Sequence, residues 1–258
     1  MINVEAIPIL QDNYVWAVHN GRSAILVDPG QAGPILAWLK DRGMIAQAIL
    51  VTHHHNDHVG GIAELLAHYA IPVYGPARGV AKTIPARDGK TLSFAGIDMI
   101  FDVFETPGHT LDHVCYVGRD EHGGPAHLFC GDTLFSVGSG RLFEGTPAQM
   151  YASLTRLAEL PGDTQVCCAH EYTLDNIAFA LEAEPDNADL QARHAQALAL
   201  RKRGEATLPV SMAVERGTNP FLRCDLPGLV EAASQHFKTA LKPGTETFAA
   251  IRTWKDET

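Results

Sequence analysis

The sequence predicts a mixed α/β body over residues 1–170, followed by a largely helical region over residues 171–258. In the first part, short apolar runs rich in β-branched residues alternate with amphipathic stretches, and the connections are short. One such run ends in a cluster of histidines and an aspartate, at a strand-to-helix loop of the kind that carries chemistry. After residue 171 the strand-like runs give way to helical periodicity.

The first part opens with a predicted hairpin. The runs 15–18 and 24–27 flank Asn20-Gly21, a dipeptide typical of tight turns between antiparallel strands. Apolar spacing predicts a helix over 34–42 and another from residue 62 to residue 69. Further apolar runs read as strands: 48–51, 71–74, 91–94, 98–103, 114–117 and the runs ending at 131 and 169.

Capping residues predict several later helices. Thr146, Pro147 and Gln149 form the pattern of a capping box with proline at the first helical position. Thr173 is expected to cap a helix over 174–183. Additional helices are expected at 188–203, which Gly204 would end, and at 227–237 and 245–254.

Composition and charge exclude several classes of protein. The 258 residues carry a formal net charge of -10, which argues against a nucleic-acid surface. Apolar runs are too short for a transmembrane helix, and the first residues lack the pattern of a signal peptide. The cysteines number five, which is odd, and no CxxC motif is present. Four of them lie in apolar runs and are interpreted as small buried hydrophobes, namely Cys115, Cys130, Cys167 and Cys168, and none is assigned to the metal site. We therefore expect a cytoplasmic protein, and a monomer is the working expectation, although the sequence is silent on oligomeric state.

The central motif is an internal cluster of metal-type ligands at residues 52–58. In extended chain, side chains two positions apart share a face, so His53 and His55 can hold one ion while His54 points elsewhere. Asp57 and His58, beyond the turn, can face a second ion. Imidazole and carboxylate are ligands that zinc, iron and manganese accept.

Three isolated residues occupy equivalent positions later in the chain. His109, Asp132 and His170 each lie where an apolar strand-like run ends, as the first cluster does. We assign His53, His55 and His109 to one ion. Asp57, His58 and His170 are assigned to a second ion, and Asp132 can bridge the two.

An open site of nitrogen and oxygen ligands is typical of catalytic rather than structural metal centres. Two divalent ions, most simply Zn²⁺ with iron or manganese as alternatives, can hold a bridging hydroxide that attacks a polarised carbonyl. Asp57 and Asp132 are the catalytic carboxylates of this hypothesis. Asp28, which ends a strand, either orients a ligand histidine or is structural, and Tyr172 is a candidate substrate contact.

The motif at residues 52–58 and the later ligands resemble the metallo-β-lactamase superfamily. The cluster fits the HxHxDH signature, and His109, Asp132 and His170 match the later ligands in order. The resemblance covers residues 1–170 and implies a four-layer αβ/βα sandwich with the metals at one edge of the sheets. Membership of a superfamily does not fix the substrate.

Further motifs resemble the hydroxyacylglutathione hydrolase family, glyoxalase II, over essentially the whole chain. They are the glycine-rich loop 138–145, the motifs at 131–135 and 170–173, Asn219-Pro220-Phe221, and residues 252–255. The resemblance implies that residues 171–258 help bind glutathione. The positions that match glutathione contacts in the family are Arg141, Phe143, Tyr172, Arg252 and Lys255. Animal members have Lys and Tyr in place of Arg141 and Phe143, so the hydroxyl of that Tyr is missing here.

The implied reaction is hydrolysis of S-D-lactoylglutathione to D-lactate and glutathione, a step in methylglyoxal detoxification. The alternative is a mononuclear iron glutathione persulfide dioxygenase, which would use two histidines and one carboxylate. The complete second ligand set and the cations Arg252 and Lys255 favour the hydrolase.

Overall fold

The computed structural model describes residues 2–76, 78 and 83–258. Its contacts divide it into two compact units. The first consists of Met1–Thr106, Asp112–Gly131 and Cys167–His170, and the second of Pro107–Leu111, Asp132–Val166 and Glu171–Thr258. Within the described ranges, the helices all fall short of the length and apolarity that crossing a bilayer requires.

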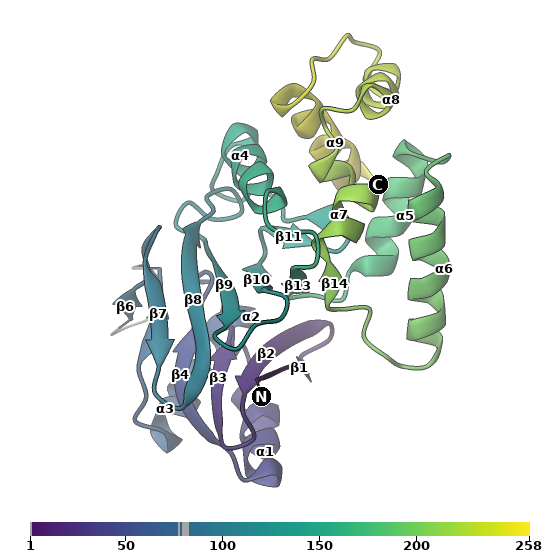
Figure 1. Ribbon diagram of the computed structural model, residues 1–258. Coiled ribbons are helices and arrows are strands. Elements are labelled where there is room, and N and C mark those ends of the chain that lie inside the picture. The colour runs from purple at the N-terminus through teal and green to yellow at the C-terminus, as the bar shows by residue number, and fades with distance from the viewer. Residues whose placement is uncertain (1, 77, 79–82) are drawn as a thin grey trace. The chain divides into compact units, whose positions relative to one another are not determined.

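A mixed sheet forms the N-terminal part of the first unit. Its strand order is β1-β2-β3-β4-β5-β6, antiparallel from β1 to β3 and parallel from β3 to β6 (Figure 1). The predicted hairpin through Asn20-Gly21 is confirmed as β2–β3, and Gly21 supplies a positive φ of 88° in its turn. The strands are β1 (Asn3–Ile9), β2 (Asn13–His19), β3 (Ser23–Val27), β4 (Ile45–Leu50), β5 (Val73–Gly75) and β6 (Ile84–Pro85).

Two helices cover one face of this sheet. Ile35 and Leu39 of α1 (Ala32–Arg42) and Leu65 of α3 (Ile62–His68) are buried in one cluster with side chains of the sheet. The predicted helix at 34–42 is confirmed and begins two residues earlier. A short helix that the sequence did not predict, α2 (Asn56–Val59), lies inside the histidine motif.

A second sheet has the strand order β14-β13-β10-β9-β8-β7. Within the first unit, two hydrogen bonds connect the sheets: Tyr116 Oη of β9 donates to the carbonyl of Val51, just after β4, at 2.8 Å, and Trp16 Nε1 of β2 donates to the Cys168 carbonyl of β13 at 2.9 Å. These bonds tie together the strand ends that precede the histidine motif and His170. The strands are β7 (Thr91–Phe94), β8 (Ile97–Glu105), β9 (Val114–Asp120), β10 (His127–Gly131), β13 (Gln165–Cys168) and β14 (Val210–Ser211).

Helices and one small hairpin make up most of the second unit. In α5 and α6, which run side by side in Figure 1, Ile177, Ala180, Leu190 and Ala197 form a buried cluster. The hairpin pairs β11 (Leu134–Phe135) with β12 (Gly138–Ser139). The helices are α4 (Pro147–Ala158), α5 (Thr173–Ala183), α6 (Ala188–Lys202), α7 (Met212–Thr218), the 3₁₀ turn η1 (Pro220–Leu222), α8 (Pro227–Phe237) and α9 (Thr245–Glu257).

The helices predicted past residue 171 are confirmed as α5, α6, α8 and α9, but one predicted cap is wrong. The N-cap of α5 is Tyr172, and the hydroxyl of Thr173 lies 2.6 Å from the hydroxyl of Thr207 instead. The sequence also did not predict α7.

The capping box of α4 is present as predicted. The Gln149 backbone amide donates to Thr146 Oγ1 at 3.3 Å, and the Thr146 backbone amide donates to Gln149 Oε1 at 2.9 Å.

We expect Thr146→Ala to lower the free energy of unfolding by about 1 kcal/mol, because a backbone amide at the start of the helix loses its acceptor. Denaturant unfolding measures this. Thr155→Ala, whose hydroxyl bonds back to the Tyr151 carbonyl in the same helix, is the control and should cost much less; equal losses would contradict the capping role.

Candidate active site

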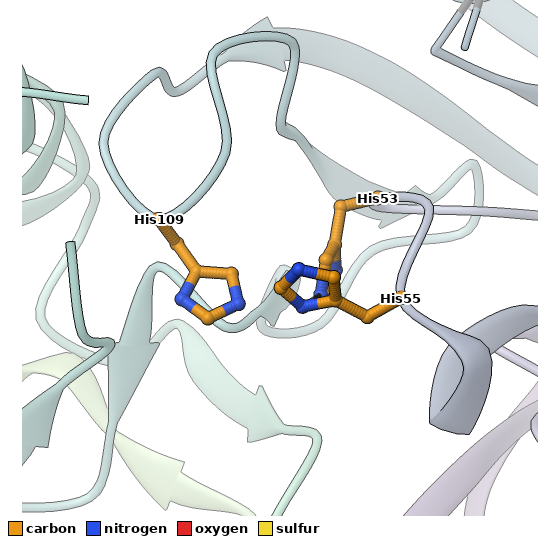
Figure 2. Close-up of side chains that lie close together, drawn as sticks. All are labelled: His53, His55 and His109. Carbon is orange, nitrogen blue, oxygen red and sulfur yellow. Dashed lines mark hydrogen bonds between the residues drawn. The ribbon is translucent and has the colours of Figure 1, made fainter. Parts of the chain in front are cut away.

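The loop after β4 brings two histidine rings together within the first unit. His53 Nε2 lies 3.0 Å from His55 Nδ1, and the ring centroids are 4.6 Å apart (Figure 2). Two ligand atoms of a tetrahedral ion with bonds of 2.0–2.1 Å are about 3.3 Å apart, so this spacing suits a metal. The intervening His54 turns toward Asp112, with 3.8 Å between Nδ1 and Oδ1. The alternation expected from the sequence is therefore present.

A second group of ligand atoms, also in the first unit, joins α2 to the end of β13. Asp57 Oδ2 lies 3.3 Å from His58 Nε2 and 3.4 Å from His170 Nε2. Ligand atoms of all three residues lie within 4.8 Å of one another. Burial raises the pKa of Asp57, but the hydrogen bonds with His170 and His58 outweigh it and hold that pKa well below its usual range. Asp57 therefore stays an anion, as a metal ligand must be.

Asp28 orients two of these histidines, which the sequence had left open. Asp28 is buried, and its Oδ2 accepts from His58 Nδ1 at 3.0 Å and from the Thr52 hydroxyl at 2.7 Å. Because that hydroxyl donates to Asp28, its oxygen is left to accept from His53 Nδ1 at 3.1 Å. Both rings then present Nε2 with its lone pair to an ion.

Residues of the β1–β2 turn orient the third histidine, and sequence reasoning missed them. Asp12 Oδ1 lies 2.7 Å from His170 Nδ1, and Asn13 Nδ2 donates to Asp57 Oδ2 at 3.0 Å. These partners are more than 40 positions from the residues they hold, so no local pattern could indicate them.

His113 also has a place that the sequence did not reveal. Its ring is fully buried and stacks on His53, with centroids 5.0 Å apart and an interplanar angle of 24°. Its Nδ1 lies 3.0 Å from the hydroxyl of Thr106. His113 therefore packs as a flat wall that limits how far the His53 ring can tilt.

The second unit contributes His109 and Asp132 as a neighbouring pair. His109 Nδ1 donates to the Arg141 carbonyl at 2.8 Å, and its Nε2 lies 3.4 Å from Asp132 Oδ2. The orientation repeats that of the other histidines, with Nδ1 held by the protein. Gly140 makes room for this pair, because a Cβ there would lie 1.9 Å from the Asp132 carbonyl oxygen.

A cavity of about 420 Å³ lies in the same unit, and His109 and Asp132 form part of its wall. All the residues that the family resemblance assigns to substrate binding line it: Arg141, Phe143, Tyr172, Arg252 and Lys255. The remaining wall comes from Phe135, Ser139, Asp175 and Asn176. The cavity thus joins two candidate metal ligands to a group of cations.

The cations of the cavity differ in how firmly they are held. Arg252 is buried and donates to the Ser139 carbonyl at 2.8 Å and to Asp256 Oδ1 at 2.9 Å. Lys255 donates to Asn176 Oδ1, and burial, followed by the charge of Arg252, lowers its pKa to about 7. Arg141 is exposed. Arg252 is therefore fixed in place, whereas the charge of Lys255 depends on pH near neutrality.

A larger cavity in the second unit, about 720 Å³, suits an anionic ligand less well. Its wall includes Glu182, Asp186 and Glu231, and its guanidinium, Arg223, is already paired with Glu184 at 2.9 Å. Acidic walls repel carboxylates, so the cavity beside His109 is the better candidate for an anionic substrate.

Comparisons with known proteins agree with the fold. Residues 10–170 match the family model of the metallo-β-lactamase superfamily, and residues 171–258 match that of the hydroxyacylglutathione hydrolase C-terminus. The hydroxyacylglutathione hydrolases of Nitrosomonas eutropha and Xanthomonas campestris pv. campestris are 48% and 49% identical to this chain. Each alignment covers 99% of this chain, with 99% of the first relative and 98% of the second.

Solved structures show the same fold. A di-iron-bound form of TTHA1623 aligns with a TM-score of 0.60 at 26% identity, over 85% of this chain and 100% of that one. ETHE1 from Myxococcus xanthus aligns with a TM-score of 0.64 at 22% identity, over 99% and 98% of the two chains. The predicted fold class, an αβ/βα metallo-β-lactamase sandwich followed by a helical C-terminal region, is confirmed.

The orientation of the ligand histidines generates a test on Asp28. We expect Asp28→Asn to weaken metal binding by roughly 10- to 100-fold, because Oδ1 accepts from the Thr52 backbone amide while Oδ2 accepts from the Thr52 hydroxyl and His58 Nδ1, and Asn has only one acceptor oxygen for these three donors. Competition of the protein with a chelator for Zn²⁺ measures this. An exposed aspartate, Asp186, provides the control as Asp186→Asn, and unchanged zinc affinity in Asp28→Asn would contradict the orienting role.

Proposed function

The chain belongs to the hydroxyacylglutathione hydrolase family, and from that premise we propose how its side chains hydrolyse S-D-lactoylglutathione to D-lactate and glutathione. Its activity is that of glyoxalase II. We assign residues 1–170 to a metal-binding catalytic domain and residues 171–258 to a domain that helps bind glutathione. The two family models divide the chain at this same position.

The metal centre of this proposal holds two divalent ions. His53, His55 and His109 would hold one ion, and Asp57, His58 and His170 would hold the other. Asp132 would be shared between the two. The donor spacings of 3.0–3.4 Å within each unit and the Nδ1 hydrogen bonds of the histidines support this assignment. Such ions, when bound, lower the pKa of water to about 7 and polarise a carbonyl oxygen.

The carboxylates and imidazoles of this centre balance its charge. Asp57 and Asp132 contribute one negative charge each, and the oriented imidazoles are neutral. Two divalent ions would therefore keep a net positive charge in the centre. Positive charge stabilises the oxyanion that forms when a thioester is attacked, which is the role that we assign to the pair of aspartates and their ions.

One observation carries the substrate assignment: a single cavity joins His109 and Asp132 to Arg252 and Lys255. A thioester carbonyl must reach the metal ligands while the carboxylates of glutathione need cations, and this wall offers both. The exposed ring of Phe143 lies 5.1 Å from the His109 ring. It can pack against the peptide chain of glutathione, but without a hydroxyl it forms no hydrogen bond there.

The leaving group needs little help from the protein. A thiol has a pKa of about 8.5, so glutathione departs readily as a thiolate near neutral pH. The chain therefore needs no general acid at the sulfur, and its residues serve to bind, orient and attack.

Zinc is the metal that we propose, with iron and manganese as alternatives because imidazole and carboxylate ligands accept all three. The structural relative TTHA1623 has a di-iron-bound form. Elemental analysis of the purified protein identifies the metal and its number per chain. We expect a cytoplasmic monomer, and the burial of all five cysteines as thiols suits a reducing compartment.

Hydrolysis of S-D-lactoylglutathione by metal-replete protein, followed spectroscopically at the thioester band, tests the function. Two ions per chain and loss of the thioester absorbance are the expected results. One ion per chain together with oxygen consumption on glutathione persulfide would point to the dioxygenase instead.

Asp132→Ala tests the bridging role. We expect at least a 1000-fold loss of thioester hydrolysis and a lower metal content, because both ions lose a shared anionic ligand. Asp186→Ala, at an exposed position between α5 and α6, is the matched control and should retain both properties. Normal turnover in Asp132→Ala would refute the bridge.

The pH dependence of KM tests whether Lys255 binds the substrate in this cavity. Because its pKa is lowered to about 7, Lys255 is a cation below that pH and loses its charge as the pH rises through it. We expect KM for S-D-lactoylglutathione to rise between pH 6 and pH 8. Lys255→Ala should raise KM about tenfold at pH 6 and flatten its dependence on pH.

The control for this test is Lys242→Ala, since the Lys242 side chain is 82% exposed and forms an ion pair with Glu246 at the surface. It should keep the parent profile. An unchanged KM in Lys255→Ala at pH 6 would remove Lys255 from the substrate site.

A further inference from the structure

The β11–β12 hairpin of the second unit has a turn that its own sequence disfavours. Val137 adopts a φ of 57°, in the left-handed region where a β-branched residue is rare. Short strands of two residues each cannot enforce such a turn by themselves. The conformation must therefore be held by groups outside the hairpin.

Glu215 of α7 is the first of these groups. It is fully buried, and its Oε1 accepts from the Ser136 hydroxyl at 2.9 Å while its Oε2 accepts from the Val137 amide at 2.9 Å. Arg193 of α6 donates to Ser136 Oγ at 3.2 Å. The serine hydroxyl thus links a buried carboxylate to a buried guanidinium, and the two charges offset each other through the turn.

Asn219 is the second group, and it begins the motif Asn219-Pro220-Phe221 that the sequence singled out without a role. Its Nδ2 lies 3.1 Å from the Phe135 carbonyl, 3.0 Å from the Gly138 carbonyl and 2.9 Å from Glu215 Oε2. The side chain therefore spans both strands of the hairpin and bonds to the residue that holds the turn. Pro220 starts the 3₁₀ turn that keeps Asn219 in place.

The hairpin in turn forms the floor of the substrate cavity. Phe135 and Ser139 line it, and the Phe135 ring lies 5.2 Å from that of Tyr172. The Ser139 carbonyl accepts from Arg252, and Asn176, which donates to the Ser136 carbonyl at 2.9 Å, accepts from Lys255. Two cations of the cavity are therefore attached to the hairpin or to a side chain that clamps it.

We propose that Glu215 and Asn219 are positioning residues for substrate recognition: they fix the 134–139 hairpin and thereby set the places of Arg252 and Lys255 for the carboxylates of glutathione. This inference rests on the proposed role of the cavity. Neither residue is among those that line the cavity.

Glu215→Gln tests the proposal, because the substitution replaces one carboxylate oxygen with an NH2 group. That group faces the Ser136 hydroxyl or the Val137 amide, from which the carboxylate accepts a hydrogen bond. We expect KM for S-D-lactoylglutathione and the inhibition constant of free glutathione each to rise about tenfold. The value of kcat should change less than about threefold, since Asp132 precedes the hairpin. A loss of folded protein alone would lower the apparent kcat and leave KM unchanged, so the split separates positioning from stability.

Two further variants keep the test decisive. Glu184→Gln removes a carboxylate that pairs with Arg223 in the same unit, at 2.9–3.1 Å, away from the hairpin; it should lower the melting temperature without changing KM. Should Glu215→Gln fail to fold, Ser136→Ala, which deletes only the linking hydroxyl, decides in its place with an expected rise in KM of roughly threefold.

The outcomes also separate this inference from the proposed function. If Lys255→Ala raises KM but folded Glu215→Gln, or Ser136→Ala in its place, keeps the parent KM and inhibition constant, the positioning role is wrong and the cavity assignment stands. If Lys255→Ala and the hairpin variants all leave KM unchanged, the cavity is not the glutathione site. A fall in kcat at constant KM would also overturn the positioning role.

Discussion

Hydrogen bonds to the Nδ1 atoms of four of the five proposed ligand histidines are the constraint on which the rest of the site depends. An imidazole that donates from Nδ1 keeps the lone pair of Nε2 for an ion, and its ring cannot turn away. Without these bonds, a cluster of imidazoles would exchange tautomers or take up protons, and the resulting cations would repel one another and the metal. The partners of His53, His58, His170 and His109 are, in that order, the Thr52 hydroxyl, Asp28, Asp12 and the Arg141 carbonyl.

Within the first unit, three of these partners lie next to strand ends, as His170 itself does. Asp28 follows β3, Thr52 follows β4, Asp12 precedes β2, and His170 follows β13. Asp28 adopts a φ of 53°, a conformation that carries some strain and that its hydrogen bonds hold in place. The strained backbone conformation therefore occurs at Asp28, the carboxylate that orients two imidazoles.

In the second unit, the candidate ligands His109 and Asp132 line the same cavity as the cations Arg252 and Lys255. Its segments Pro107–Leu111 and Asp132–Val166 belong with the C-terminal helices, although the family models divide the chain near residue 170. His109 and Asp132 therefore share a scaffold with Arg252 and Lys255. Arg252 donates to the Ser139 carbonyl of the β11–β12 hairpin, and Lys255 is linked to the hairpin through Asn176.

The sequence by itself determined the structural features that depend on residues close together along the chain. The alternation of His53 and His55, the capping box at Thr146 and the periodic helices α5, α6, α8 and α9 are all set by spacings of a few residues. The motif at residues 52–58 and the later candidate ligands also indicated the family.

Only the tertiary structure decided which residues hold these groups in place. Asp12 lies 158 positions from His170, and Glu215 lies 79 from Ser136, so no local pattern records either pair. The short helices α2 and α7 were not predicted from the sequence, because contacts with distant segments, rather than their own periodicity, stabilise them.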